Sequence, residues 1–200
     1  MEHYLIAALA GYACGSIPFG LLLTRLAGLG DVRRICSGNI GATNVLRTGN
    51  KKLAAATLLL DLAKGFVPVF VASRWQADLA GLVALAAVVG HCFPVWLGFK
   101  GGKGAATTAG VCFGLGWPVG LIYAAVWLGM VALTRISSLG SLSAVVAAPI
   151  AIYALGHEPA FPYFVAIAAL VIWLHRANIA RLRNGTEPRV GGGTSPRHGA

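Results

Sequence analysis

In residues 79–104, LAGLVALAAVVGHCFPVWLGFKGGKG, an apolar run passes directly into a glycine-rich segment with two lysines. Five more runs are almost free of charge: residues 4–23, 53–73, 119–134, 142–156 and 161–174. Several approach the roughly 20 residues that cross the hydrocarbon core of a bilayer. Only 11% of the residues are charged, whereas soluble domains carry about 25%. The sequence therefore predicts an all-α, polytopic membrane protein.

The basic residues predict how the chain is oriented. The formal net charge is +10, but the lysines and arginines are divided among the segments between apolar runs. This pattern suits a lipid bilayer and anionic substrates better than nucleic acid. Because positive residues stay on the cytoplasmic side, four segments should lie inside: those from Arg25 to Lys52, from Lys100 to Lys103, at Arg135, and from Arg176 to Arg197. The N-terminus would then lie outside and the C-terminus in the cytoplasm, with an odd number of spans.

The number of spans depends on residues 103–135. Both ends of this segment should be cytoplasmic, so the chain crosses twice or turns back within the membrane. The segment offers roughly 15 residues per crossing, which is short for a full span, and residues 114–118 carry a turn signal. We expect seven transmembrane helices, some of them short; a re-entrant hairpin with five full spans is the alternative. We assign residues 1–183 to one integral membrane domain and residues 184–200 to a disordered cytoplasmic tail.

The first glycine-rich loop, residues 37–49, is a candidate for binding phosphate. Glycine lets successive backbone N–H groups converge on an anion, and Arg47 offers a guanidinium fork for phosphate. Side-chain donors are also dense here: Ser37, Asn39, Thr43 and Asn44. The alternative is a polar interfacial loop without a ligand.

The second glycine-rich loop, residues 99–104, lies where one apolar run ends and the next begins. If a helix starts near Gly104, its free N–H groups and its dipole face Lys100 and Lys103, which suits a phosphate. The spacing of a Walker A motif is absent. The alternative is a positive turn that serves only to orient the chain.

Other polar residues lie within or beside the apolar runs. Asp61 and Lys64 are three residues apart, so they share a helical face and can pair; a structural and a catalytic ion pair both fit. Residues 135–141 offer hydroxyl groups that also suit the N-cap of the next helix. His175 and Asn178 share a helical face at the end of the last run.

Several catalytic patterns are absent from the sequence. An HxxxxD acid–base motif does not occur, because Trp96 stands five residues after His91 and Ala180 five residues after His175. We expect His91 to be structural. The chain has no GxSxG elbow and no carboxylate cluster for a metal. With 6 acidic residues in the whole chain, a conventional Asp or Glu base is not expected.

From about Gly15 to Leu182 the chain resembles the bacterial acyl-phosphate-dependent glycerol-3-phosphate acyltransferases, the PlsY-type family. Six motifs in the same order carry this resemblance: GSIPFG at 15–20, SGNIGATNVLR at 37–47, LDLAKG at 60–65, GHCFPVWLGFKGGKG at 90–104, SSLGS at 137–141 and HRANIARL at 175–182. Cys36 and Gly140 stand where family members often carry glycine and alanine.

The resemblance implies an activity and a location. The expected reaction transfers a fatty acyl group from acyl phosphate to the 1-hydroxyl of sn-glycerol 3-phosphate, giving lysophosphatidic acid and phosphate, the first step of phospholipid synthesis. It implies a seven-helix fold in the bacterial inner membrane with the active site on the cytoplasmic face. No cofactor, metal or acyl-CoA is expected.

The resemblance also implies roles for individual residues. Ser37 to Gly41 match the stretch expected to cradle acyl phosphate, and Arg47 and Lys103 match cations expected on substrate phosphate. Catalytic roles are expected for Ser37, Lys103, His175 and Asn178, with Ser138, His175 and Asn178 positioning glycerol 3-phosphate. The full substrate-binding set is Ser37, Gly38, Asn39, Gly41, Thr43, Asn44, Arg47, Lys100, Gly101, Gly102, Lys103, Gly104, Ser138, Ser141, His175 and Asn178.

Such a reaction needs positioning more than acid–base chemistry. Acyl phosphate is already activated, so the protein must hold two dianions together and stabilise charge moving onto the leaving phosphate. A substrate phosphate oxygen or His175 would accept the hydroxyl proton. A transporter for a phosphorylated solute is the alternative from another class, but transporters bind near the bilayer midplane, whereas these motifs gather on one face.

Overall fold

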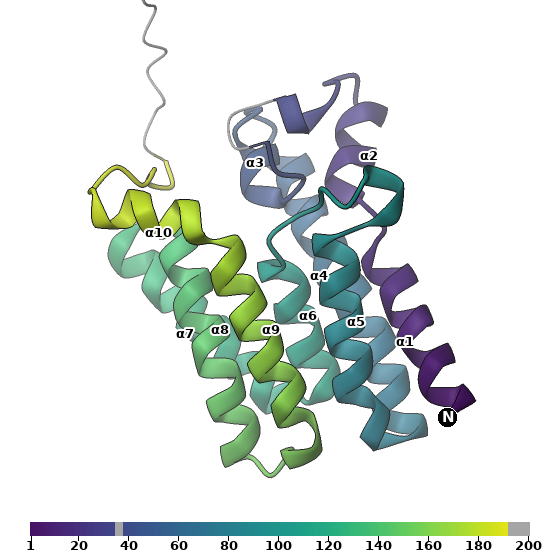
Figure 1. Ribbon diagram of the computed structural model, residues 1–200. Helices are drawn as coiled ribbons and strands as arrows, with labels where there is room; N and C mark the ends of the chain where they lie inside the picture. Colours follow the sequence, from purple (N-terminus) through teal and green to yellow (C-terminus); the bar gives the residue numbers. More distant parts are fainter. Residues whose placement is uncertain (35–37, 192–200) are drawn as a thin grey trace, which may run out of the picture.

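The computed structural model describes residues 1–34 and 38–191, and all regular elements within these ranges are helical (Figure 1). The predicted all-α class is confirmed. The α-helices are α1 (Glu2–Gly15), α2 (Phe19–Leu26), α3 (Ala42–Leu46), α4 (Lys51–Trp75), α5 (Ala80–Cys92), α6 (Ala105–Leu115), α7 (Trp117–Thr134), α8 (Ser137–Ala154), α9 (Phe161–Leu174) and α10 (Arg176–Arg183). Short 3₁₀ turns lie at η1 (Val32–Arg34), η2 (Ala77–Leu79), η3 (Val95–Leu97) and η4 (Glu158–Ala160).

Within the described ranges, 5 helical segments are long and apolar enough to cross a membrane: Glu2–Leu26, Lys51–Trp75, Ala77–Leu97, Trp117–Thr134 and Ser137–Ala154. The pair Glu158–Leu174 and Arg176–Arg183, bent by 59°, makes a sixth when it is taken as one span. Helix α6 is apolar but has 11 residues, so it is only about 16 Å long.

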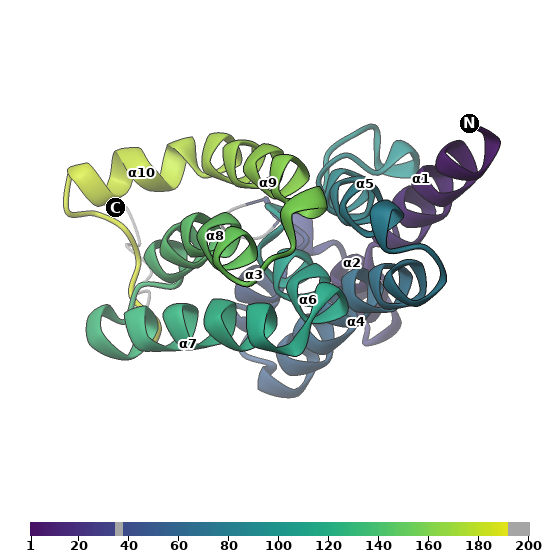
Figure 2. The same ribbon diagram turned by 90° about the horizontal axis from the view of Figure 1, so that it is seen from below.

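The long helices stand side by side as a bundle. Seen from below, α1, α4, α5 and α6 form one group and α7, α8 and α9 the other (Figure 2). The most extensive helix pairs are α4 with α6, α1 with α5, and α7 with α8. Helices α2 and α3 and, apart from them, α10 lie at the end of the bundle opposite the N-terminus (Figure 1).

Small residues allow the closest of these helix contacts. A Cβ atom added at Gly110 of α6 would lie 2.0 Å from the Leu62 carbonyl oxygen of α4, and one at Gly15 of α1 would lie 2.0 Å from the Ala87 carbonyl oxygen of α5. Backbones can approach this closely only where a side chain is absent. Such contacts stabilise helix pairs in lipid, where apolar surfaces gain little from leaving the solvent.

The apolar run 4–23 was expected as one helix, but it is divided into α1 and α2. Pro18 precedes α2 and has no N–H to continue the ladder of α1. The carbonyl oxygens freed at the break find side-chain donors instead: Trp96 Nε1 donates to Ser16 at 2.7 Å, and Lys64 Nζ donates to Ile17 at 2.7 Å. The break is therefore held by residues from α4 and η3.

Two predicted boundaries around α6 are confirmed. Gly104, with a φ of 87°, is the N-cap of α6, and α6 ends at Leu115 just before the turn at Gly116. Pro118 lies in the first turn of α7, where its missing N–H leaves no bond unmade.

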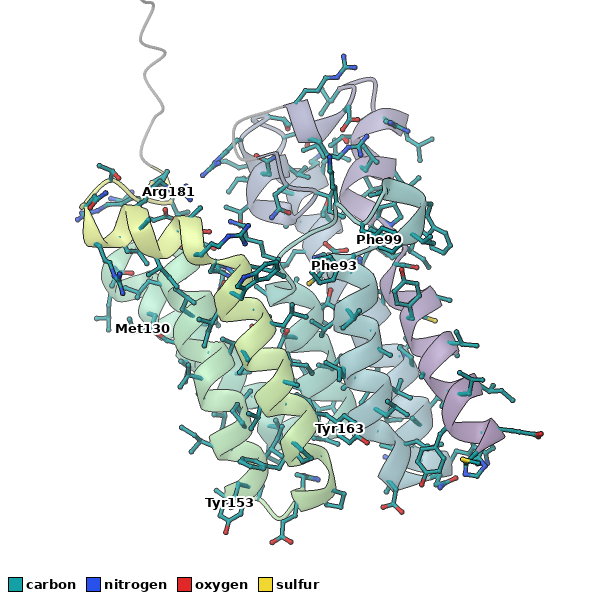
Figure 3. All side chains as sticks on the ribbon, viewed as in Figure 1. Phe93, Phe99, Met130, Tyr153, Tyr163 and Arg181 are labelled. Atoms are coloured by element: carbon teal, nitrogen blue, oxygen red, sulfur yellow. The ribbon has the colours of Figure 1, made fainter. Side chains whose placement is uncertain are left out.

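Charged side chains are concentrated at one end of the bundle. Figure 3 shows nitrogen-bearing side chains gathered where Arg181 and Phe99 are labelled, whereas Tyr153 lies at the opposite end. The tail expected from residue 184 is described as far as residue 191, and the Val190 N–H donates to the Arg135 carbonyl at 2.6 Å. The rest of that expected tail, 192–200, lies outside the described residues.

Candidate active site

The loop before α6 brings Lys103 to the charged end of the bundle. Its backbone is anchored to the end of α5, because the Gly101 N–H donates to the Cys92 carbonyl and the Gly102 N–H donates to the His91 carbonyl, both at 3.0 Å. Gly98 and Phe99 adopt positive φ angles of 59° and 62°, a conformation that is costly for phenylalanine and clusters at functional sites. Lys100 is exposed and Lys103 is half-buried.

A hydrogen-bonded network extends from Lys103 across the bundle to three other segments. Lys103 Nζ donates to Asn178 Oδ1 of α10. Asn178 Nδ2 donates to Glu187 Oε1 at 2.6 Å, and Ser138 Oγ of α8 donates to the same oxygen at 2.6 Å. Arg181 Nε donates to Glu187 Oε2 at 2.7 Å. The structure therefore brings into one cluster three residues that lie in separate sequence motifs and were expected to bind substrate: Lys103, Ser138 and Asn178.

Burial and neighbouring charges shift the pKa values in this cluster. Burial lowers the pKa of Lys103, and the charge of Arg181 lowers it further, against an opposing effect of Glu187. Arg47 in the first loop is a further positive charge that lowers it. Burial alone would raise the pKa of Glu187, but hydrogen bonds from Ser138, Asn178 and Arg181 together lower it. The site thus concentrates positive charge around one carboxylate and is suited to bind anions.

His175 lies just beyond α9, beside the same cluster. Its Nδ1 lies 2.7 Å from the Val171 carbonyl oxygen, so Nδ1 carries the proton and Nε2 can accept one. Burial lowers the pKa of His175, which favours the neutral ring. Ser141 Oγ accepts a hydrogen bond from Trp127 Nε1 at 3.3 Å and donates to the Ser137 carbonyl at 3.0 Å.

The first glycine-rich loop has its own small core and internal hydrogen bonds. Leu21, Val32, Ile40, Val45 and Ala54 pack together beneath it. Asn44 is buried and its Nδ2 donates to the Val32 and Asn39 carbonyls, while Asn39 Oδ1 accepts from the Gly41 N–H.

Other expected residues of the first loop are more open to solvent. Gly38, with a φ of 66°, Thr43 and Arg47 are exposed. Ser37, for which a catalytic role was expected, lies outside the described residues. Asp31 and Arg33 form a 2.6 Å ion pair beside this loop, and the hydrogen bond from Arg33 holds the pKa of Asp31 well below its usual range.

Two members of the cluster were missed by reasoning from the sequence. Glu187 lies in the segment that was assigned to a disordered tail, and Arg181 was counted only as a topogenic charge. The available signal was that Glu187 is the one acidic residue in a basic C-terminal segment. Within the described residues, His, Cys, Asp and Glu side chains form no group of three or more that could hold a metal ion.

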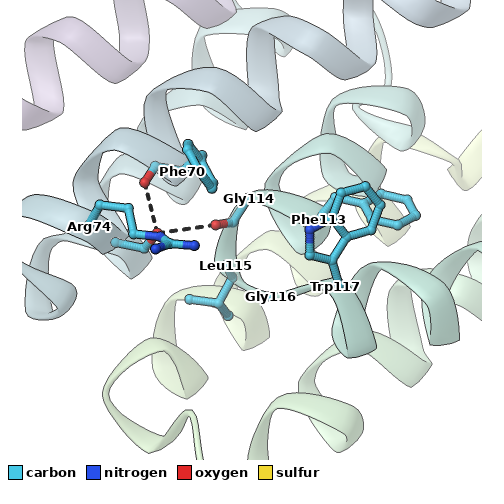
Figure 4. A pocket seen from close by; sticks show the side chains of 8 residues that line it. Phe70, Arg74, Phe113, Gly114, Leu115, Gly116 and Trp117 are labelled. Carbon is cyan, nitrogen blue, oxygen red and sulfur yellow. Dashed lines mark hydrogen bonds between the residues drawn. The ribbon is translucent and has the colours of Figure 1, made fainter.

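Two cavities between the described residues lie away from this cluster. One of about 60 Å³ is found at the turn between α6 and α7, where Phe70, Arg74, Phe113 and Trp117 line it (Figure 4). Ser73 Oγ donates to the Phe70 and Gly114 carbonyls there. A shallower apolar depression of about 230 Å³ is lined by Leu62, Phe66, Phe113 and Trp117. Arg74 is the one charged residue that lines the first of these cavities, and the lining of the second is entirely apolar.

Comparisons with known proteins identify the family of this chain. The family model described as glycerol-3-phosphate acyltransferase matches residues 5–185. Glycerol-3-phosphate acyltransferase from Erythrobacter litoralis is 69% identical over 93% of this chain and 94% of its own length. The Brucella anthropi enzyme of the same name is 60% identical, with 94% of each chain covered.

A solved structure has the same fold. A crystal structure of PlsY, described as an integral membrane glycerol 3-phosphate acyltransferase in its glycerol 3-phosphate form, matches with a TM-score of 0.90 and 39% identity, covering 94% of this chain and 96% of that one. The lysophosphatidic acid form matches with a TM-score of 0.87. Since the family model covers residues 5–185, the relatives are up to 69% identical and the fold is shared, this chain belongs to the glycerol-3-phosphate acyltransferase family.

Proposed function

We propose that this chain transfers a fatty acyl group from acyl phosphate to the 1-hydroxyl of sn-glycerol 3-phosphate, with lysophosphatidic acid and phosphate as products. The observation that carries the proposal is the convergence of Lys103, Ser138 and Asn178 in a fold shared with an enzyme whose structure contains glycerol 3-phosphate. Donors from three separate segments meet where a small phosphorylated substrate can be held.

Each of the two glycine-rich loops binds a different substrate. The first loop, with Ser37 to Gly41, cradles the acyl phosphate, and Arg47 binds its phosphate. Lys103 and the backbone of residues 100–104 bind glycerol 3-phosphate, which Ser138, His175 and Asn178 orient. Arg47 lies near enough to Lys103 for its charge to lower the Lys103 pKa, and two phosphates that react together need cations on both sides.

The chemical step replaces one acyl–oxygen bond with another. The 1-hydroxyl oxygen attacks the acyl carbonyl carbon, the bond from that carbon to the phosphate oxygen breaks, and inorganic phosphate leaves. The hydroxyl proton passes to a phosphate oxygen of a substrate, with His175 Nε2 as the competing acceptor. In the His175→Ala variant, loss of kcat with intact substrate binding would favour the histidine.

Residues 1–183 form one membrane domain with seven spans in the bacterial inner membrane. The N-terminus is outside, and the active site and C-terminus face the cytoplasm. Two features support this topology: α6 and α7 are joined by a tight turn at Gly116, and the N-terminus and α10 lie at opposite ends of the bundle. The gathering of basic residues at the α10 end supports the orientation.

The experiment is an assay of the purified protein with palmitoyl phosphate and glycerol 3-phosphate. We expect one lysophosphatidic acid and one phosphate per turnover, and no product when palmitoyl-CoA replaces the acyl phosphate. Product from palmitoyl-CoA alone would overturn the choice of donor. Uptake of glycerol 3-phosphate into proteoliposomes without lipid formation would instead indicate a transporter.

A further inference from the structure

Three ionisable side chains are buried together beneath the second glycine-rich loop. Asp61 and Lys64 of α4 and His91 of α5 are 1%, 5% and 3% exposed, although apolar helices surround them. Lys64 Nζ lies 2.7 Å from Asp61 Oδ1, so the pairing expected from their spacing is confirmed. The same Nζ donates to the Ile17 carbonyl at the break between α1 and α2. Lys64 therefore connects the Asp61 carboxylate to the break between α1 and α2.

His91 connects this ion pair to the loop. On one side, its Nδ1 lies 3.8 Å from Asp61 Oδ1. Apart from the Lys64 pair, neither of these two atoms has a hydrogen-bond partner in the described part of the chain. On the other side, the ring lies against Gly102, because a Cβ atom added there would be 1.9 Å from His91 Nε2. The His91 carbonyl also accepts the Gly102 N–H.

We propose that Asp61, Lys64 and His91 form a positioning unit that fixes residues 101–103 for binding the phosphate of glycerol 3-phosphate; this rests on the proposed function. The Asp61 carboxylate lies 3.8 Å from His91 Nδ1, beyond a direct hydrogen bond, and orients the imidazole by electrostatic attraction of the Nδ1–H. The ring in turn limits where the backbone at Gly102 can lie. Lys103 follows directly, so its Nζ reaches Asn178 only when Gly102 is correctly placed.

Energetics favour positioning over simple stabilisation. The free energy lost when two charged groups leave water is about as large as the free energy gained from their attraction. A buried ion pair therefore adds little to the stability of a fold. Charged groups within a membrane bundle are retained where they serve a function. The geometry here is consistent with a positioning role. Lys64 pairs with Asp61, Asp61 lies beside His91, and the His91 ring lies against Gly102 of the second glycine-rich loop.

The first test compares steady-state kinetics of Asp61→Asn and His91→Gln with the wild type. Both replacements keep the volume of the side chain but remove the oriented carboxylate–imidazole contact. We expect the KM for glycerol 3-phosphate to rise between about tenfold and 100-fold, because a shift of about 1 Å in a substrate-positioning group has effects of this size. The KM for acyl phosphate should change less than twofold.

The control is Ile152→Ala, which creates a cavity at a fully buried position of α8 away from the loop. It should lower the thermal unfolding temperature while the KM values of the folded enzyme stay at the wild-type level. If Asp61→Asn and His91→Gln behave like Ile152→Ala, the unit is only structural and the proposal is wrong. If the wild type makes no lysophosphatidic acid from acyl phosphate, the proposed function fails first.

The second test is a double-mutant cycle between Gly102 and His91. Gly102→Ala should reduce kcat/KM strongly in the wild-type background, where the new methyl group meets the imidazole. The additional loss should be at least tenfold smaller in the His91→Ala background, because the ring is absent there. Equal losses in both backgrounds would show that the ring does not set the loop, which would overturn the proposal even if His91→Gln fails to fold.

Discussion

Lys103 and Glu187 have opposite charges within one network and are joined through the side-chain amide of Asn178. Asn178 accepts from Lys103 with its oxygen and donates to Glu187 with its nitrogen. This arrangement fixes the orientation of the amide, and among the described residues Lys103 is the only cation that forms a hydrogen bond with the Asn178 side chain. Loss of either charged residue should therefore change the site in a distinct way.

Replacing Lys103 by glutamine should reduce kcat/KM for glycerol 3-phosphate by about 10²–10³-fold, because removal of one donor from a developing negative charge has this effect. The fold should be retained, since a half-buried lysine is not needed for packing. Steady-state kinetics at varied glycerol 3-phosphate check this. The control is Lys52→Gln at an exposed position of α4, and a similar loss there would show that total charge, not position, is important.

Replacing Glu187 by glutamine should lower the free energy of unfolding by about 2 kcal/mol, because hydrogen bonds to a charged group contribute about this much. The pKa of Glu187 is below its ordinary value of 4.5 in the folded protein, so its charge stabilises the fold above pH 4.5. That stabilisation is lost as the pH falls through the folded-state pKa.

Thermal unfolding over a range of pH checks this prediction. The difference between wild type and Glu187→Gln should be constant between about pH 6 and pH 8 and should shrink below about pH 4.5. Glu158→Gln, at an exposed position of η4 between α8 and α9, should show no comparable difference. A difference for Glu187→Gln that grows as the pH falls would contradict the account.

At the scale of the elements, the contact between α4 and α6 determines where the loop before α6 lies. Helix α6 is too short to be positioned by the membrane alone, so its contact with α4 must position it. Gly65, Gly110 and Gly114 all lie where the two backbones meet. Close packing of α6 on α4 therefore fixes Gly104, at the start of α6, relative to the Asp61–Lys64 pair of α4.

Gly110→Leu should separate α4 from α6 and lower the free energy of unfolding by about 3 kcal/mol, the upper range for overpacking a close contact. Thermal unfolding in detergent measures the change. Gly129→Leu in α7 is the matched control, because nothing lies within 4 Å of a Cβ atom added there. Equal effects of both variants would mean that the close α4–α6 contact does not stabilise the bundle.

Apolar runs were sufficient to predict most elements, because each helix must satisfy its own backbone within the membrane. The runs at 161–174 and the turn near Gly116 match α9 and the α6–α7 boundary. The break at Pro18 was missed, because its stability depends on donors from Lys64 and Trp96, far away in the sequence. Sequence patterns around Pro18 do not indicate which distant side chains will donate hydrogen bonds to the break.

At the scale of the whole molecule, the site is assembled from segments far apart in the chain. The motifs identified Lys103, Ser138 and Asn178 separately, since each lies in a recognisable pattern. Glu187 has no periodic or glycine-rich context, and its contact with Ser138 spans 49 residues. Its place in the network follows only from how α8 and α10 pack, which the sequence does not specify locally.

Under the proposed function, both phosphates bind at the basic end of the bundle, on the cytoplasmic side. Sealed inverted membrane vesicles test it most directly, because glycerol 3-phosphate is charged and does not cross the bilayer unaided. With palmitoyl phosphate in the membrane, inverted vesicles should make lysophosphatidic acid from external glycerol 3-phosphate, and right-side-out vesicles should do so only after permeabilisation. Synthesis by intact right-side-out vesicles, with none by inverted ones, would contradict the account.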